Sequence, residues 1–267
     1  MSQIKFKGKN VVELATWLKR FSTINNSLLF EIDTKTQELI GKTYSEDRSL
    51  VKMSRISFSD LGFTMETKPI EERVRIGLYN ILKMNKILGQ FAGSDLELTI
   101  KYSPNISDDQ EESLAGLNIL FTNSLLKVGL ECSSLSIFDY LSDEKFTNSI
   151  AFLESENVSF DLKKEDKDQI MILSDLDKDF RKMNFRVIDG KVYARSKTFE
   201  LQLGISKGEK FEFPILKSQF SKLDSENYHI RIGDNRAVLE STDSQTVSVI
   251  GILNENDYDS EKELDLN

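Results

Sequence analysis

The sequence has few of the residues on which many catalytic and metal sites depend: one cysteine, one histidine and three prolines among 267 residues. Cys132 alone can form no disulfide within the chain, which excludes a secreted disulfide framework and a cysteine-based zinc site. His229 stands alone as well, so it cannot by itself build a catalytic triad or a histidine-rich metal site. The low proline and glycine content excludes fibrous and disordered classes.

Long apolar runs are missing too. No stretch approaches the length that a membrane-spanning helix needs, and the N-terminal MSQIKFKGKN is polar and basic, unlike a signal peptide. We therefore expect a soluble, intracellular protein without a membrane partner. If a phage encodes it, we expect it in the cytoplasm of the host cell.

Two short motifs resemble ligand sites but lack required residues. Gly41-Lys42-Thr43 copies the end of a phosphate-binding loop, yet Thr36 stands where the first glycine belongs. The alternating acids of 175–179 resemble the start of a calcium-binding loop, but Phe180 stands where that loop requires a glycine. We expect no enzymatic activity, no cofactor and no metal site. We interpret Cys132 as a near-core thiol, His229 as a hydrogen-bonded strand residue and Trp17 as a packing residue at the rim of a helix stripe.

Acidic residues outnumber basic ones by 44 to 35, but the excess is local. The segment 103–116 has four acids and no base, and 254–267 has six acids and one lysine. The remaining chain carries 34 residues of each sign. The folded body can therefore carry a positive face despite the net charge of -9.

Short alternation of apolar and polar residues dominates the sequence and predicts strands. The predicted strands are 27–33, 37–44, 49–58, 95–102, 117–123, 125–133, 184–189, 191–199, 200–206, 227–234, 236–242 and 247–253. Asp189-Gly190 and residues 233–235 are typical of hairpin turns.

Four segments instead place apolar residues at helical spacing: 10–23, 78–91, 163–180 and 214–223. In 163–180 the apolar stripe comprises Ile170, Leu173, Leu176 and Phe180, and in 214–223 Pro214 occupies the first turn. The segments 78–91 and 214–223 carry lysines and no carboxylate.

Basic or amide side chains lie opposite the apolar stripe in all four predicted helices. They are Lys19, Arg20, Lys83, Lys86, Gln90, Lys164, Lys167, Lys178, Lys217 and Lys222. Each lysine taken singly is typical of a solvated helix surface. If the helices share one side of their sheets, however, the lysines form one positive surface suited to the phosphates of double-stranded DNA. Without a base-reading element, that contact is weak and independent of sequence.

The order of elements repeats along the chain. A short strand, a turn and an amphipathic helix occupy 3–18 and again 157–176, and strands follow each. The pattern predicts an α+β protein with two copies of one domain type rather than a solenoid. We predict an N-terminal domain over 1–138, a connector over 139–156, a C-terminal domain over 157–256 and an acidic flexible tail over 257–267.

Two repeated domains of this kind resemble the DNA sliding clamps, most closely the trimeric clamp of T-even phages. The resemblance rests on residues 18–32, 34–58, 190–214 and 234–252. It implies tandem clamp domains, each with antiparallel sheets outside and two helices on the inner face of a closed homotrimeric ring. It further implies that the ring encircles DNA and tethers the replicative DNA polymerase, and that a separate ATP-dependent clamp loader opens it.

The resemblance also implies an apolar pocket near the connector for peptides of the polymerase and the loader. The candidate pocket residues are Ile137, Phe138, Tyr140, Leu141, Val249, Ile250 and Ile252. Each could equally be a core residue.

A different class of protein remains open at this point. The same elements could form a structural phage protein of the tail or capsid, built of two β-rich domains. That alternative requires neither a basic bias on the helices nor a ring.

Overall fold

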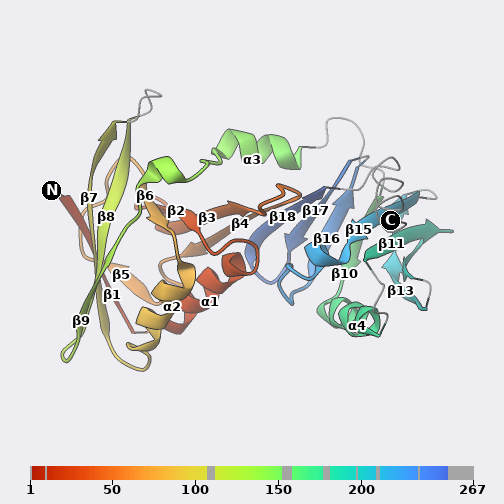
Figure 1. Ribbon diagram of the computed structural model, residues 1–267, viewed down its shortest axis with the longest axis horizontal. Coiled ribbons are helices and arrows are strands. Elements are labelled where there is room, and N and C mark those ends of the chain that lie inside the picture. The colour runs from red at the N-terminus through yellow and green to blue at the C-terminus, as the bar shows by residue number, and fades with distance from the viewer. Residues whose placement is uncertain are drawn as a thin grey trace, which may run out of the picture. The chain divides into compact units, whose positions relative to one another are not determined.

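The computed structural model describes residues 2–9, 11–106, 112–151, 158–176, 181–196, 198–208, 211–233 and 235–251 (Figure 1). The predicted site residues Lys178 and Ile252 lie outside these ranges, as do the predicted tail and residues 107–111 of the acidic segment.

Two compact units divide the chain. Unit 1 comprises Met1–Tyr44 and Met53–Ser142, and unit 2 comprises Ser45–Lys52 and Asp143–Asn267. A short N-terminal segment thus belongs to the unit that is otherwise C-terminal. The finer boundaries expected from the sequence stay a prediction.

The sheet of unit 1 has the strand order β4-β3-β2-β6-β8-β7-β1-β5, and β9 pairs with β8. Most neighbours run antiparallel, as when Glu31 of β2 lies opposite Arg75 of β6, whereas β6 and β8 run parallel at Val74 and Leu114. The strands are β1 (Ser2–Gly8), β2 (Leu28–Asp33), β3 (Glu38–Tyr44), β4 (Leu50–Ser57), β5 (Phe63–Met65), β6 (Val74–Leu78), β7 (Leu96–Ile106), β8 (Glu112–Thr122) and β9 (Lys127–Glu131).

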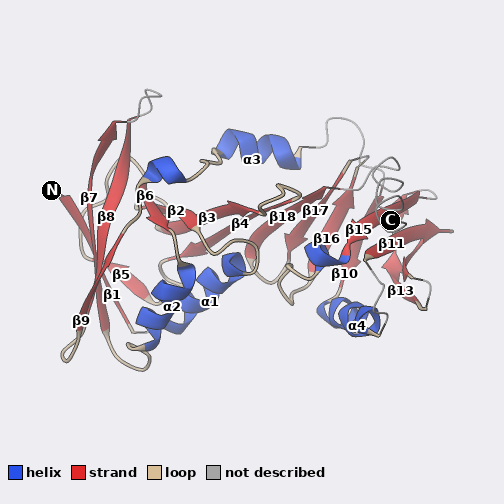
Figure 2. Ribbon diagram, in the orientation of Figure 1, coloured by secondary structure: helices blue, strands red, loops and turns tan. Residues whose placement is uncertain are grey.

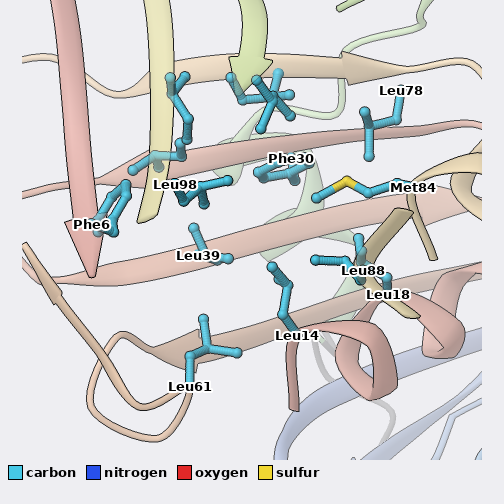
Figure 3. Close-up of a cluster of buried hydrophobic side chains, with 14 of the residues drawn as sticks. Phe6, Leu14, Leu18, Phe30, Leu39, Leu61, Leu78, Met84, Leu88 and Leu98 are labelled. Atoms are coloured by element: carbon cyan, nitrogen blue, oxygen red, sulfur yellow. The ribbon is translucent and has the colours of Figure 1, made fainter. Parts of the chain in front are cut away.

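Helices α1 (Val11–Ser22) and α2 (Ile81–Gly89) cover one face of this sheet, and a short 3-10 turn, η1 (Leu135–Ile137), follows β9. Figure 3 shows Leu14 and Leu18 of α1 and Met84 and Leu88 of α2 in the core that they form with strand residues such as Phe30. Burial of this apolar surface is the main force that holds the helices on the sheet.

Unit 2 contains the sheet order β14-β10-β16-β17-β18 and a four-stranded sheet, β13-β12-β11-β15, with antiparallel pairing (Figure 2). Its strands are β10 (Val158–Leu162), β11 (Lys182–Ile188), β12 (Lys191–Arg195), β13 (Glu200–Ile205), β14 (Lys207–Gly208), β15 (Phe211–Leu216), β16 (Tyr228–Ile232), β17 (Arg236–Ser241) and β18 (Gln245–Gly251). Its helices are α3 (Asp143–Ile150), α4 (Lys164–Asp175) and α5 (Lys217–Phe220).

These elements confirm the predicted α+β class with antiparallel sheets. The predicted repetition is present, because β1 leads into α1 as β10 leads into α4. The predicted Asp189-Gly190 turn is confirmed as well: both residues have positive φ, 50° and 74°, as a two-residue hairpin turn requires.

Two sequence predictions are wrong, and one helix was not predicted. The segment 214–223 is helical only at α5, and Pro214 lies in β15, an edge strand where the missing N–H costs no hydrogen bond. Helix α3, which lies within the predicted connector, was not among the predicted helices. Trp17 lies in the core rather than at its rim, with its ring centroid 5.1 Å from that of Phe21. Among the described residues, no helix is both long and apolar enough to cross a membrane.

Candidate nucleic-acid interface and partner groove

The exposed face of α1 and α2 carries most of the basic residues predicted in unit 1. The two helices lie side by side (Figure 1). The Ile81 N–H donates a 2.9 Å hydrogen bond to the Asn26 carbonyl, which brings the start of α2 close to the end of α1. Asn80 caps α2, since its side chain accepts a 2.9 Å hydrogen bond from the Lys83 N–H.

The cations of unit 1 are accessible. Lys19, Lys83, Lys86 and Gln90 are exposed and Arg20 is half-buried, whereas Leu14, Leu18, Met84 and Leu88 face the core. Helix α2 has no acidic residue, and the acid of α1, Glu13, lies in the first turn, away from Lys19 and Arg20 in the last. Basic residues in a last turn also complement the helix dipole. This face therefore presents positive charge without a neighbouring carboxylate on α2.

In unit 2, helix α4 differs from the prediction. Ile170 of the predicted apolar stripe is buried as expected, but Leu176 is exposed, and Lys167 and Ser174 are buried. The predicted stripe is therefore correct at Ile170 and wrong at Leu176. Lys167 is 5% exposed, with its Nζ 5.8 Å from the centre of the Phe220 ring, and burial lowers its pKa. A buried ammonium group cannot reach DNA.

The other predicted cations of unit 2 differ in exposure: one is exposed, and two are partly buried or paired within the protein. Lys164 is exposed, whereas the Lys217 Nζ forms a 2.8 Å ion pair with Asp175 and donates to the Ser174 carbonyl. Lys222 is half-buried, and its carbonyl accepts a hydrogen bond from the Nζ of Lys52. Among the predicted cations that the structure describes, fewer are accessible in unit 2 than in unit 1.

Lys52 is fully buried in unit 2 and forms a 3.1 Å ion pair with Asp224. The pair joins the segment Ser45–Lys52 to the chain that follows α5. Removal of either partner would leave an uncompensated buried charge.

The segment after η1 is fixed on the sheet of unit 1 by a network around Glu31. This buried carboxylate accepts a 3.0 Å hydrogen bond from the Tyr140 hydroxyl and lies 3.3 Å from Arg73, 3.4 Å from Arg75 and 3.7 Å from Lys42. The Arg75 guanidinium lies 3.8 Å from the centre of the Tyr140 ring, a cation–π contact.

Two further contacts hold the same segment. The Lys42 Nζ donates a 3.1 Å hydrogen bond to the Leu141 carbonyl. Phe138 packs on Gly77, where an added Cβ would lie 2.5 Å from the phenyl ring. The sequence analysis missed this network, although an acid between two apolar residues, Glu31 in the strand LLFEID, was a signal.

A groove of about 200 Å³ lies beside this segment within unit 1. Ile137, which is 59% exposed, lines it together with Phe138 and Asp139. Its other side is formed by β2, β3 and the residues before them: Asn25, Ser27, Leu29, Lys42, Thr43 and Tyr44. Tyr140 and Leu141 line a smaller neighbouring cavity with Glu31.

The structure brings only some of the predicted pocket residues to a surface. Val249 and Ile250 are buried in β18, so they are core residues, as the alternative interpretation held. Residues 248–250 are buried in succession, and since neighbouring side chains of a strand point to opposite faces, both faces of β18 are covered there.

Residues with potential for other chemistry have structural roles. Burial raises the pKa of the Cys132 thiol to about 12, which makes it a poor nucleophile. His229 Nδ1 lies 2.8 Å from the Asp161 carboxylate on the neighbouring strand. In the described part of the chain, no group of three or more His, Cys, Asp and Glu side chains could hold a metal ion.

Neither a family model nor a curated protein matches the sequence. Solved structures match almost the whole chain. PCNA of Thermococcus kodakaraensis is 11% identical, with a TM-score of 0.63 and coverage of 94% of this chain and 100% of that one. A. fulgidus PCNA, solved with the C-terminal region of FEN-1, is 12% identical, with a TM-score of 0.61 and coverage of 93% and 97%.

A bacterial protein shares the fold as well. The Helicobacter pylori beta clamp, solved with a DNA ligase peptide, is 12% identical with a TM-score of 0.64. The match covers 94% of this chain but 66% of the beta clamp. Likeness at such low identity concerns the fold, and the predicted resemblance to T-even phage clamps in particular stays a prediction. The chain has the fold of the DNA sliding clamps, with tandem clamp domains.

Proposed function

We propose that this protein is a DNA sliding clamp: a closed ring of three copies that encircles double-stranded DNA and tethers the replicative DNA polymerase. The main support is the exposed face of α1 and α2, where Lys19, Lys83 and Lys86 lie without a carboxylate on α2. A ring needs only weak contacts with the phosphates, because its topology prevents dissociation while it slides. The role is mechanical rather than enzymatic.

The contact surface is centred on unit 1. Arg20 and Gln90 extend it, and Lys164 and Lys222 add charge from unit 2. Lys217 contributes less in this proposal, since its ammonium is paired with Asp175. Phosphate contacts from these side chains carry no information about base sequence.

Ring closure requires strand edges that are free in one copy. In the described residues, β9 pairs only with β8 and β13 only with β12. Two strongly exposed apolar residues adjoin these strands: Leu125 before β9 and Ile205 at the end of β13. We propose that β9 of one copy pairs with β13 of the next, which covers both edges.

Partner proteins would bind beside the η1 segment. The groove lined by Ile137, Phe138 and Asp139 has the size for a few side chains of a peptide. The H. pylori beta clamp and A. fulgidus PCNA were solved with peptides of partner proteins. These complexes support the expectation that peptides of the polymerase and of an ATP-dependent loader bind here. A tethered polymerase remains at high effective concentration at the template.

Native mass spectrometry and negative-stain imaging of the purified chain test the proposal. We expect a trimer with a central hole. Ile205→Asp should yield monomers, because a carboxylate replaces an apolar side chain at the interface, whereas Ile172→Asp on exposed α4 should leave the trimer intact. A monomeric wild type, or an open-ended assembly as a virion protein would form, would contradict the proposal.

A further inference from the structure

Two large apolar side chains are exposed at the start of α2. Tyr79 immediately precedes the Asn80 cap and is 71% exposed, and Leu82 in the first turn is 52% exposed. The exposed face of an amphipathic helix is expected to be polar. Leu82 therefore departs from the pattern, and it does so on the face that carries Lys83 and Lys86.

Leu82 lies among these lysines rather than toward the core. Residues four apart share a helix face, so Leu82 lies beside Lys86, and Lys83 follows it directly. The buried residues Ile81, Met84 and Leu88 define the opposite face. The side chain of Leu82 thus projects into solvent within the basic surface.

The end of α1 completes a patch around the two residues. The hydrogen bond from the Ile81 N–H to the Asn26 carbonyl places the start of α2 beside the chain that leaves α1. Lys19 and Arg20 lie in that last turn of α1. We call the set comprising Lys19, Tyr79, Leu82, Lys83 and Lys86 the basic-apolar patch: two exposed apolar side chains and three exposed lysines on neighbouring helices.

We infer that Tyr79 and Leu82 bind the sugar-phosphate backbone of double-stranded DNA. Leu82 and the Tyr79 ring contact the apolar edges of deoxyribose, while the Tyr79 hydroxyl donates a hydrogen bond to a phosphate oxygen. The inference rests on the proposed function and adds a second kind of contact to it. The cations around the patch select a polyanion as the occupant, because a neutral apolar partner would leave them unpaired.

The two kinds of contact differ in their response to salt. Each lysine that neutralises a phosphate releases counterions, so its contribution falls as salt rises. Burial of apolar surface releases no counterion and persists at higher ionic strength. At high salt the patch would therefore retain part of its affinity for duplex DNA, whereas a surface of lysines alone would lose most of its affinity.

Helix α4 of unit 2 provides a contrast. Ile172 and Leu176 are exposed there too, but Glu165 and Asp175 are exposed on the same helix. Carboxylates repel phosphates, so we expect these apolar residues of α4 not to contact DNA. The inference is confined to unit 1.

Fluorescence anisotropy of a labelled duplex, titrated with the full-length protein over a series of NaCl concentrations, tests the inference. Leu82→Ala and Tyr79→Ala should each weaken binding about fivefold at every salt concentration, with the slope of log K against log [NaCl] unchanged. Lys83→Ala should reduce that slope by about 0.9. Ile188→Ala, which truncates an exposed aliphatic residue of β11, is the matched control and should bind as the wild type does.

The outcomes separate this inference from the proposed function. If the wild type binds duplex and both variants match it, the apolar contact is overturned while the clamp proposal stands. If the variants change the salt slope instead, their effect acts through the lysines and the inference also fails. If the wild type binds no duplex at any salt concentration, the inference fails, whereas the clamp proposal is decided by the native mass and imaging described above, because a closed ring is held by topology rather than by affinity. Native mass and circular dichroism of each variant confirm that the fold and assembly are retained.

Discussion

The Tyr140 hydroxyl donates a hydrogen bond of 3.0 Å to the buried carboxylate of Glu31. Glu31 lies on β2, while Tyr140 belongs to the segment that follows η1, more than a hundred residues later in the sequence. The same carboxylate neutralises Arg75, which lies directly opposite it on β6 and under the Tyr140 ring. Glu31 thus offsets part of the positive charge on this side of the sheet, while Asp33 pairs with Arg73, and Glu31 also holds the segment that forms the proposed partner groove.

Tyr140→Phe removes this hydrogen bond and keeps the ring on Arg75. We expect a loss of about 1 kcal/mol in the free energy of unfolding and faster hydrogen exchange in residues 135–142. Glu31→Gln should cost more, about 3 kcal/mol, because buried cations lose their counter-charge. Glu72→Gln, at an exposed position, is the control and should change neither measurement. Equal protection of the segment in Tyr140→Phe and wild type would contradict the assigned role.

Gly77→Ala should destabilise the packing of the segment after η1 on the sheet, because the added methyl group clashes with it. A Cβ at Gly77 would lie 2.5 Å from the Phe138 ring and 2.7 Å from the Ser133 carbonyl oxygen. We expect a loss of about 1–3 kcal/mol from overpacking, measured by chemical denaturation. Gly89→Ala, whose Cβ would meet nothing within 4 Å, is the matched control and should stabilise helix α2 by up to about 1 kcal/mol.

Lys83→Ala combined with Lys86→Ala should shorten the products of loader-dependent primer extension while native mass stays that of the wild type. The reason is the loss of two phosphate contacts, each of which carries a salt-dependent part of the affinity. Lys68→Ala with Lys101→Ala removes the same charge from exposed positions outside the helices. If both double variants shorten the products equally, net charge rather than the helix face is responsible.

Lys167→Met should stabilise the protein near neutral pH by about 1 kcal/mol, because the methionine avoids the desolvation that lowers the lysine pKa. Asp224 keeps Lys52 as its partner in this variant. In the wild type, the unfolded state binds more protons between the lowered folded pKa and 10.5, so stability rises with pH there.

The difference between Lys167→Met and wild type should therefore shrink as the pH rises toward 10.5. Denaturation at several pH values measures it, and exposed Lys163→Met serves as the control. A difference that does not change with pH would show that packing, not charge, causes the effect.

Local patterns predicted the helices and strands whose faces alternate cleanly. Helix α1 and strand β2 lie within two residues of their predicted bounds, since apolar residues recur at helical spacing in α1 and at every second position in β2. Strand β3 was located equally well, although it is buried on both faces. Strand β15 was misread because Leu216, Phe220 and Leu223 also fit helical spacing. Short strands such as β5 carry too few residues to show a period.

The site depends on pairings that local patterns do not contain. Glu31 meets Arg75 because β2 pairs with β6, and no property of either strand alone fixes that neighbour or its register. The sequence likewise places Lys167 on the polar face of its helix, whereas in the structure Lys167 and Ser174 lie on the buried face of α4. The exposed Leu82 was visible in the sequence, since it falls off the apolar stripe of its own helix.

The Lys52–Asp224 pair has a consequence for biosynthesis. The ammonium group emerges from the ribosome early, and its partner follows only after most of the polypeptide has been translated. Until then the nascent chain cannot bury Lys52 without leaving a charge uncompensated. Unit 2 therefore cannot be completed from the C-terminal part of the chain alone, and a gene that began after residue 142 would encode it without Ser45–Lys52.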